Sequence, residues 1–369
     1  MRNLRFLLAL LLLVGCADAA EEEPGDPYQV LAFDKTVVSS LGDHPNFQRA
    51  RAEIDLGKGP FERATVVVEL ESPCFPFSKW RVPGAIPTGH LWPAACDAFD
   101  RTFSIRLLPK EEGRPALELV RAITPFGGPM QFEVDVTDVA NGLPGEHEIE
   151  VYIGTWPDPE GRVSGSEGRW FVSAHLEMVP GTPPREVLAV VPLFSGDWKG
   201  PALDRIFSYE LKIPKGAKTA RLEYRATGHG GGRFDPAVCV GPAEEFCRRK
   251  HGIYLGREPL FEGEPWVSCD DNCQVVANDP QAPFAYCAQN PCANHESARA
   301  PRANWCPGQL GPPIVLDDPP PTRARPPPGG GLGGPVVPGG GTPLPRGGGG
   351  GGSEPVLTHQ VNHGSAEGV

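Results

Sequence analysis

Apolar and β-branched residues recur in short runs along residues 29–318, and most of the runs alternate with polar residues. The clearest runs cover residues 65–70, 103–107, 148–153, 187–193, 207–212 and 219–224. Clusters of Gly, Pro, Asp and Asn separate nearly all of them. Alternation with a period of two is typical of a strand with one buried face, and such clusters favour turns. We therefore predict a strand at each of these six runs.

The spacing of the runs predicts the fold class. No stretch after residue 16 keeps a helical period of apolar positions for three turns. Many short strands joined by long loops are typical of antiparallel sandwiches. Segment 178–185 has two proline-rich steps before a new apolar run, so we place a domain boundary there. The expected protein is all-β, with one sandwich over residues 29–180 and a second over residues 181–318.

The composition changes after residue 318. Of the 49 residues from 321 to 369, 25 are Gly or Pro, and no apolar period is visible. This composition is typical of disordered segments, so we predict a disordered tail over residues 319–369. One hypothesis is that the reading frame shifts near residue 318, which would leave the second sandwich incomplete. The alternative is that the tail is native.

Composition and charge narrow the classes of protein further. The 369 residues include 46 Gly and 44 Pro, nearly a quarter of the chain, where about 12% is usual. Both residues are unfavourable in helix interiors, which argues against a mostly helical protein. The 34 Lys and Arg against 46 Asp and Glu give a net charge of −12. This acidic balance argues against nucleic acid as a partner.

Residues 1–16 have the pattern of an export signal. Arg2 and Arg5 precede an unbroken apolar run at residues 6–14, too short for a membrane-spanning helix of about 20 residues. The run ends at Gly15-Cys16, which resembles the bacterial lipobox. We expect a lipoprotein signal over residues 1–16, lipidation at Cys16, an acidic tether over residues 17–28 and anchoring at the outer membrane or cell surface. The alternative is an ordinary signal peptide with Cys16 incidental.

Export would expose the other nine cysteines to an oxidising compartment, where disulfides form. Nine is odd, so at least one cysteine stays free or pairs elsewhere. Short spacings separate Cys269 from Cys273 and Cys287 from Cys292, and zinc is the alternative reading of such pairs. Irregular spacing and the compartment favour disulfides over a metal site. The disulfide candidates are Cys74, Cys96, Cys239, Cys247, Cys269 and Cys306.

Several segments, in order, resemble the peptide-N-glycosidase F family of bacterial amidases, which remove N-glycans from asparagine. In the first half they are residues 33–36, 96–101, 123–126, 133–138 and 152–156. In the second half they are residues 181–183, 189–192, 228–229, 245–247 and 302–308. No single motif is decisive, and their shared order over residues 29–310 carries the resemblance. It implies two eight-stranded antiparallel jelly rolls side by side, in agreement with the strand pattern.

The resemblance also implies roles for individual residues. Hydrolysis of a glycosyl-amide needs a base that activates water, and the family's Asp-Arg pair matches Asp100-Arg101. Asp100 would activate water, and Arg101 would orient the substrate. Glu245 would bind or polarise the glycan, with Glu244 as the competitor one residue away. From the residues alone, an Asp-Arg pair is more often a surface ion pair.

Three further residues match substrate-binding positions in the family's cleft: Trp156, His229 and Arg302. An aromatic ring can stack on a sugar face, and the alternative for Trp156 is a core aromatic. Gly154 departs from the family, which has an acidic residue at this position. That difference removes one carboxylate from the expected site.

The function implied is an amidase that acts, as a monomer without cofactor or metal, on N-glycosylated proteins or peptides. Gly154 and the changed end of the chain motivate an alternative, a non-catalytic glycan- or protein-binding lipoprotein. A copper-dependent monooxygenase is a remote alternative, because such enzymes share the two-sandwich fold. Copper there needs His and Met ligands, whereas the chain has three Met and no His-X-His pair.

Overall fold

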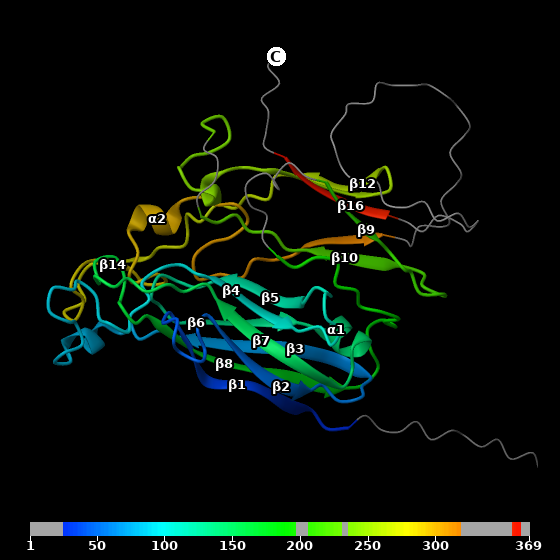
Figure 1. Ribbon diagram of the computed structural model, residues 1–369, viewed down its shortest axis with the longest axis horizontal. Coiled ribbons are helices and arrows are strands. Elements are labelled where there is room, and N and C mark those ends of the chain that lie inside the picture. The colour runs from blue at the N-terminus through cyan, green and yellow to red at the C-terminus, as the bar shows by residue number, and fades with distance from the viewer. Residues whose placement is uncertain (1–24, 197–205, 231–234, 319–355, 363–369) are drawn as a thin grey trace, which may run out of the picture.

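The computed structural model describes residues 25–196, 206–230, 235–318 and 356–362. Its named strands pair antiparallel throughout, so the predicted all-β antiparallel class is confirmed (Figure 1). Within these ranges, no helix is both long and apolar enough to cross a membrane. The predicted signal segment, lipidation at Cys16, tether up to residue 24, and tail residues 319–355 and 363–369 lie outside the described residues.

The first half of the chain, residues 28–180, forms two packed four-stranded sheets, ordered β1-β8-β3-β6 and β2-β7-β4-β5. Its strands are β1 (Tyr28–Ser39), β2 (Arg49–Asp55), β3 (Phe61–Glu71), β4 (Thr102–Leu107), β5 (Leu117–Ile123), β6 (Met130–Asp135), β7 (Glu146–Ile153) and β8 (Arg169–Pro180). Strand β1 pairs with β8, β2 with β7, β3 with β6 and β4 with β5. This nested pairing is the connectivity of an eight-stranded jelly roll.

Alternation of side chains turns one face of each sheet into the core. In β8, every second residue from Trp170 to Met178 is buried, and in β7 the buried apolar residues are Ile149, Val151 and Ile153. Buried side chains of both sheets join one hydrophobic cluster. Removal of this apolar surface from water is the main stabilising contribution to the first half.

The strand predicted at residues 187–193 is wrong. This segment has no regular secondary structure, and a Cβ added to Gly142, at the end of helix α1 (Thr137–Gly142), would meet both Val187 and Val190. Arg185, just before it, forms an ion pair of 3.0 Å with Asp138 of the same helix. The segment therefore follows the surface of the first sandwich and uses its valines for packing instead of strand pairing.

The second half, residues 181–318 and 356–362, contains a four-stranded sheet ordered β12-β11-β16-β9, a β10-β15 ladder and a short β13-β14 pair. Its elements are β9 (Ile206–Glu210), β10 (Ala220–Tyr224), β11 (Lys250–Leu255), β12 (Glu258–Gly263), β13 (Val275–Val276), β14 (Tyr286–Cys287), α2 (His295–Arg299), β15 (Ile314–Asp318) and β16 (Val356–Asn362). The described part thus places six strands in its two longer ladders, where eight were expected. We keep the division after Pro180 as a proposal, because β8 ends there.

Residues 356–362 correct the prediction of a disordered tail. They form β16, which lies between β11 and β9, with His359 opposite Ile253 on one side and Phe207 on the other. This stretch contains no Gly or Pro and includes three β-branched residues, a composition that favours a strand. The high Gly and Pro content of the tail as a whole concealed this short strand.

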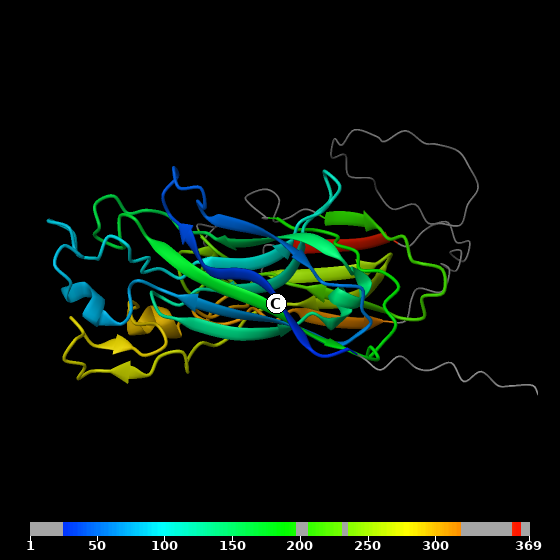
Figure 2. The ribbon, with the colours of Figure 1, turned by 90° about the horizontal axis from the view of Figure 1, so that it is seen from below.

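The two halves meet along β5, the edge strand of its sheet. The Ile123 amide donates to the Gln309 carbonyl (3.1 Å), and the Gly308 amide donates to the Ile123 carbonyl (3.0 Å). This pairing covers backbone groups that an edge strand would otherwise leave open. At one end, the loop with the 3-10 helix Phe77–Arg81 lies beside the β13-β14 pair in both views (Figures 1 and 2), and the Phe77 and Tyr286 rings are 4.9 Å apart.

Four disulfides join cysteines in the described part of the chain. They are Cys74–Cys96, Cys239–Cys247, Cys269–Cys306 and Cys273–Cys287. All six candidate cysteines are therefore oxidised, and Cys292 is the free one. The short spacings between Cys269 and Cys273 and between Cys287 and Cys292 do not correspond to bonds.

Candidate active site

Asp100 and Trp156 lie at the same end of one sheet of the first sandwich. Asp100 precedes β4, and Trp156 follows β7, the strand that pairs with β4. The Gly154 amide donates to the Thr102 carbonyl at 3.0 Å, and Arg101 Nη2 donates to the Trp156 carbonyl at 3.3 Å. These contacts hold the segments of Asp100 and Trp156 together.

A buried threonine fixes the backbone next to Asp100. The Arg101 amide donates to Thr124 Oγ1 at 2.8 Å, and the Thr124 amide donates to the Arg101 carbonyl at 2.8 Å. Thr124 Oγ1 also donates to the Phe99 carbonyl at 3.2 Å. The threonine of the 123–126 segment therefore clamps the chain on both sides of Asp100.

Arg302 supplies a buried, fixed guanidinium from the second half. Its side chain is fully buried, and Nη1 donates to the carbonyls of Ser297 (2.6 Å) and Ala300 (2.9 Å). Its Cζ atom lies 5.1 Å from the centre of the Phe246 ring and 4.7 Å from that of Trp305. Aromatic faces attract a guanidinium, so the group is held by carbonyls and rings together.

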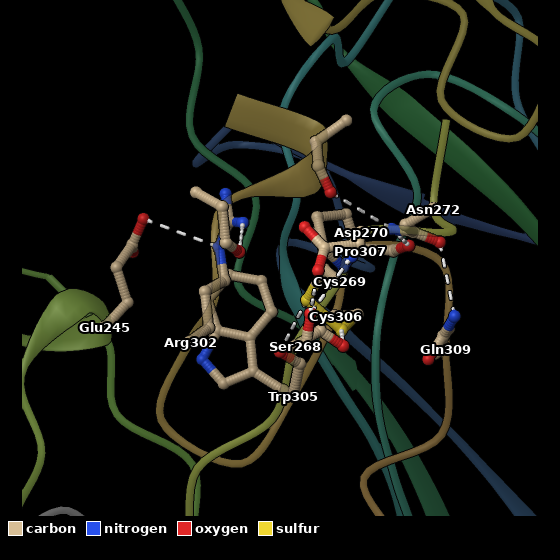
Figure 3. The surroundings of a disulfide bond; sticks show 12 residues. Glu245, Ser268, Cys269, Asp270, Asn272, Arg302, Trp305, Cys306, Pro307 and Gln309 are labelled. Atoms are coloured by element: carbon tan, nitrogen blue, oxygen red, sulfur yellow. Dashed lines mark hydrogen bonds and ion pairs between the residues drawn. A yellow bond between two sulfur atoms is a disulfide. The ribbon is translucent and has the colours of Figure 1, made fainter. Parts of the chain in front are cut away.

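The two carboxylates expected at the site both face this guanidinium. Arg302 Nη2 lies 3.6 Å from Asp100 Oδ2, and Arg302 Nε lies 3.9 Å from Glu245 Oε1, the contact drawn in Figure 3. Asp100 Oδ2 and Arg302 Nε are buried and make no hydrogen bond with any described residue. A buried donor and a buried acceptor without partners are costly, and they give this site unused capacity to bind a polar ligand.

The shared guanidinium does not offset the burial of both acids. Burial, and then the charge of Glu245, raises the pKa of Asp100 to about 7, although Arg302 and Arg101 oppose the shift. Burial also raises the pKa of Glu245, again opposed by Arg302. Two carboxylates beside one guanidinium in a partly dry site favour retention of a proton. Asp100 is thus an acid–base group that titrates close to neutral pH.

The structure distinguishes Glu245 from its neighbour. The Glu244 carboxylate accepts from Arg249 Nε at 2.6 Å and from Nη2 at 2.8 Å. The Glu245 carbonyl accepts from the Ala303 amide at 2.8 Å, which ties its 3-10 helix (Glu244–Phe246) to the segment of Arg302. Glu245 is therefore the glutamate whose side chain lies at the site, whereas Glu244 forms an ion pair elsewhere.

Arg101 has a different environment from the one expected. Its Nε lies 3.0 Å from both carboxylate oxygens of Asp97, and Nη2 donates to Asp97 Oδ1 at 2.7 Å and to the Trp156 carbonyl at 3.3 Å. These contacts occupy the guanidinium fork. The expectation that Arg101 orients a substrate is therefore replaced by a contact within the protein.

Trp156 and His229 lie in contrasting environments. The Trp156 side chain is exposed (58%) and packs edge-on against Phe47, so it is not a core aromatic. The His229 ring stacks on Trp305 with 4.8 Å between ring centres, and its Nε2 lies 2.9 Å from Thr227 Oγ1. His229 thus supports the indole that contacts Arg302, whereas Trp156 is accessible to a ligand.

Gly154 lies at the same end of the sheet as Asp100 and Trp156, without a side chain. A Cβ atom added there would lie 3.3 Å from the Tyr152 hydroxyl. A side chain at this position would therefore have to displace the Tyr152 ring slightly.

Two groups of side chains in the described part lie close enough to share a metal ion. One is Cys74, Cys96 and Cys292, and the other is Cys273, Cys287 and His295. In each group two sulfurs form a disulfide. A metal binds thiolate sulfur, so in this oxidised form each group presents one other ligand only.

Sequence reasoning missed three residues that build the site. Asp97 binds Arg101, Thr124 clamps the backbone, and Phe246 stacks on Arg302. Each of them stands within or beside a segment already noted for its resemblance to the family. The contacts of Thr124 and Phe246 join distant segments, which no local pattern shows, and the Asp97–Arg101 contact depends on how the loop between them folds.

Comparisons with known proteins show what the sequence is similar to. Residues 202–317 match the family model "Peptide-N-glycosidase F, C terminal". A curated relative, the peptide-N(4)-(N-acetyl-beta-D-glucosaminyl)asparagine amidase F of Elizabethkingia miricola, is 28% identical over 231 residues, which are 59% of this chain and 57% of that protein. The chain therefore spans little more than half the length of this relative.

Solved structures show the same fold. The structure titled PNGF-II aligns with a TM-score of 0.57 at 16% identity, covering 93% of this chain and 63% of that one. Recombinant peptide:N-glycanase F aligns with a TM-score of 0.56 at 20% identity, covering 91% of this chain and 88% of that one. These structures share the fold of this chain, and the family model and the curated relative show that its sequence is similar to peptide-N-glycosidase F.

Proposed function

We propose that this protein is an amidase that hydrolyses the bond between an asparagine side chain and its N-linked glycan, in glycoproteins or glycopeptides. The observation that supports it most is the convergence of Asp100 and Glu245 on the buried guanidinium of Arg302. The reaction converts the glycosylated asparagine and water into an aspartic acid and a glycosylamine. It needs a base for the water and a partner for the charge that develops on the amide oxygen.

Asp100 is the base. Its pKa of about 7 lies near working pH, where a general base is most effective. It accepts a proton from water as the water oxygen attacks the amide carbon. Because ionised Asp100 is the active form, the rate rises with pH through about 7.

Arg302 and Glu245 act on the substrate. The Nε–H of Arg302 has no hydrogen-bond acceptor among the described residues, so it is available to a substrate oxygen. A guanidinium placed where charge develops in a dry site stabilises a transition state strongly. Glu245, whose charge raises the pKa of Asp100, accepts hydrogen bonds from the glycan. Trp156 offers an exposed ring for stacking on a sugar.

Release of glycan from a denatured N-glycoprotein, seen as a mobility shift on a gel, tests the proposal. The matched control is Asp100→Asn, which keeps the side-chain shape and removes the base. A shift with the wild-type protein but not with the variant supports the proposal. If the wild type gives no shift at high enzyme concentration, the amidase proposal fails.

A second function is favoured by Gly154, which lacks the family's carboxylate. In this alternative the protein binds glycans or proteins without cleaving them. Retained binding of a glycopeptide in the absence of any cleavage, together with loss of binding in Trp156→Ala, would support it.

We also propose that the protein is exported and anchored through Cys16. The four disulfides agree with an oxidising compartment. Metabolic labelling with a radioactive fatty acid tests this, with Cys16→Ala as the control. Equal label in both proteins, or none in either, rejects the anchor.

A further inference from the structure

Asp97 is a fully buried carboxylate at the centre of a hydrogen-bond network beside the site. Its side chain is 0% exposed. Besides the contacts from Arg101, it accepts from Thr155 Oγ1 at 2.5 Å and from Trp170 Nε1 at 3.0 Å. Four donor groups, which make five contacts with one buried acid, are far more than an isolated surface ion pair provides.

The network connects two segments that carry site residues. Arg101 directly follows Asp100, and its Nη2 also reaches the Trp156 carbonyl at 3.3 Å. Thr155 directly precedes Trp156. Asp97 therefore holds the loop of the base and the segment of the exposed indole through one carboxylate.

We propose that Asp97 is a positioning residue of this site, which sets the placement of Asp100 through Arg101 and the placement of Trp156 through Thr155. The proposal rests on the proposed amidase function and adds to it the group that aligns its base with its sugar-binding ring. Asp97 itself touches neither substrate nor water in this role. Trp170, from the central strand β8, ties the network to the rigid core.

The network also affects the charge around Asp100. Arg101 is one of the two guanidiniums that lower the pKa of Asp100 against the effect of burial. In the wild type, the Asp97 carboxylate balances the Arg101 charge at 2.7 Å. Without that partner, Arg101 acts on Asp100 unbalanced, which lowers the pKa of Asp100.

The test compares three variants by steady-state kinetics on one glycopeptide across pH. In Asp97→Asn we expect kcat to fall at least tenfold and the acid limb of its pH profile to move down by about one pH unit. In Thr155→Val, which breaks only the contact toward Trp156, we expect KM to rise with kcat within about threefold. The proposal is overturned if Asp97→Asn has the wild-type pH profile with kcat within twofold.

Glu150→Gln is the matched control. Glu150 is also a buried carboxylate of the first sandwich, with Arg51 Nε at 2.9 Å and Arg106 as a second partner. Its loss should lower stability while kcat, KM and the pH profile stay unchanged. An equal shift of the pH profile in Glu150→Gln would show that any buried charge has this effect, and it would overturn the positioning role.

A measurement without turnover separates this inference from the amidase proposal. The carboxyl carbon of Asp100, identified by its absence in Asp100→Asn, is titrated by NMR in the wild type and in Asp97→Asn. A lower midpoint in Asp97→Asn supports the positioning role even if no glycopeptide is cleaved. An unchanged midpoint overturns it. If Asp97→Asn does not fold, Arg101→Lys replaces it in the kinetic comparison: it keeps the charge but loses the fork that Asp97 holds, so kcat should fall at least tenfold. A kcat within twofold of the wild type would then overturn the proposal.

Discussion

The two halves of the molecule bury different kinds of side chain. In the first half, aliphatic and aromatic residues of two four-stranded sheets form one large cluster. In the described part of the second half, five of the ten buried apolar residues are cysteines, and all five form disulfides. The first half is therefore stabilised mainly by hydrophobic burial, and the second depends on covalent bonds between its loops.

The candidate site combines residues from both halves of the molecule. Asp100 stands at the end of a sheet whose register the core determines. Glu245 and Arg302 stand on loops next to the disulfides Cys239–Cys247 and Cys269–Cys306. The comparison teaches that the base lies at the end of a packed sheet, whereas Glu245 and Arg302 lie on disulfide-linked segments, where carbonyls and aromatic rings hold the Arg302 guanidinium.

The largest expected effect is the loss of activity in Asp100→Asn. Removal of the base should lower kcat about a thousandfold, within the range for general-base catalysis. The glycan-release rate on a glycopeptide measures it. A loss below tenfold would contradict the role of Asp100.

The same variant should be more stable than the wild type in alkaline solution. The folded pKa of about 7 lies above the ordinary value near 3.9, so the stability from protonated Asp100 is full below about pH 4. That contribution is lost as pH rises through 7. Asp100→Asn should therefore gain on the order of a few kcal/mol at pH 8 and nearly nothing at pH 4. Urea unfolding at both pH values is the measurement. An equal gain in the free energy of unfolding at pH 4 and pH 8 would contradict a raised pKa of Asp100.

The next effect in size is that of Arg302→Met. Removal of one partner from a buried ionic group typically costs about 3–5 kcal/mol, and here it leaves two carboxylates without their cation. We expect this destabilisation together with a kcat lower by about a hundredfold. Thermal unfolding measures the destabilisation, and steady-state kinetics measures kcat. Retention of full activity would mean that the guanidinium is structural only.

Removal of single disulfides tests the comparison between the halves directly. The double substitution Cys269→Ala/Cys306→Ala should cost about 2–4 kcal/mol and lower activity, because this bond adjoins the segment of Arg302. The matched control is Cys74→Ala/Cys96→Ala in the first half, which we expect to lose less stability because the hydrophobic cluster remains. Equal losses in urea unfolding would contradict the distinction.

The smallest expected effect comes from Gly154→Asp. It places a carboxylate at the end of the sheet where Asp100 and Trp156 lie, with the new Cβ 3.3 Å from the Tyr152 hydroxyl, so that ring must shift slightly. We expect a change in kcat/KM of a few fold and an acid limb moved to higher pH, because a like charge disfavours ionisation of Asp100. Gly154→Asn controls for size. Identical pH profiles for the two variants would show that the added charge does not affect the ionisation of Asp100.

The fold was more predictable from the sequence than the site. Alternation located β3, β4 and β7, whose inner face is buried, and also β9 and β10, whose inner face is only partly covered. It failed at residues 187–193, where Val187 and Val190 lie against α1 without strand pairing. The prediction from composition missed β16, because the Gly and Pro content of the long tail concealed a short strand.

At the site, motif resemblance pointed to Asp100, Glu245 and Arg302, but it left two questions to the structure. One was the choice between Glu244 and Glu245, which the Arg249 pair decides. The other was the partner of Arg101, which is Asp97 four residues before it. Both answers depend on which side chains the folded loops bring together, and neither spacing nor composition contains that information.

The measurement that tests the central claim most directly is the pH dependence of kcat for glycopeptide hydrolysis in the wild type and in Glu245→Gln. The wild type should show an acid limb with a midpoint near pH 7, the pKa of Asp100. Because the charge of Glu245 raises that pKa, the limb should move to lower pH in Glu245→Gln. A wild-type limb near pH 4, or a limb that Glu245→Gln leaves in place, would contradict the coupling of the two halves at this site.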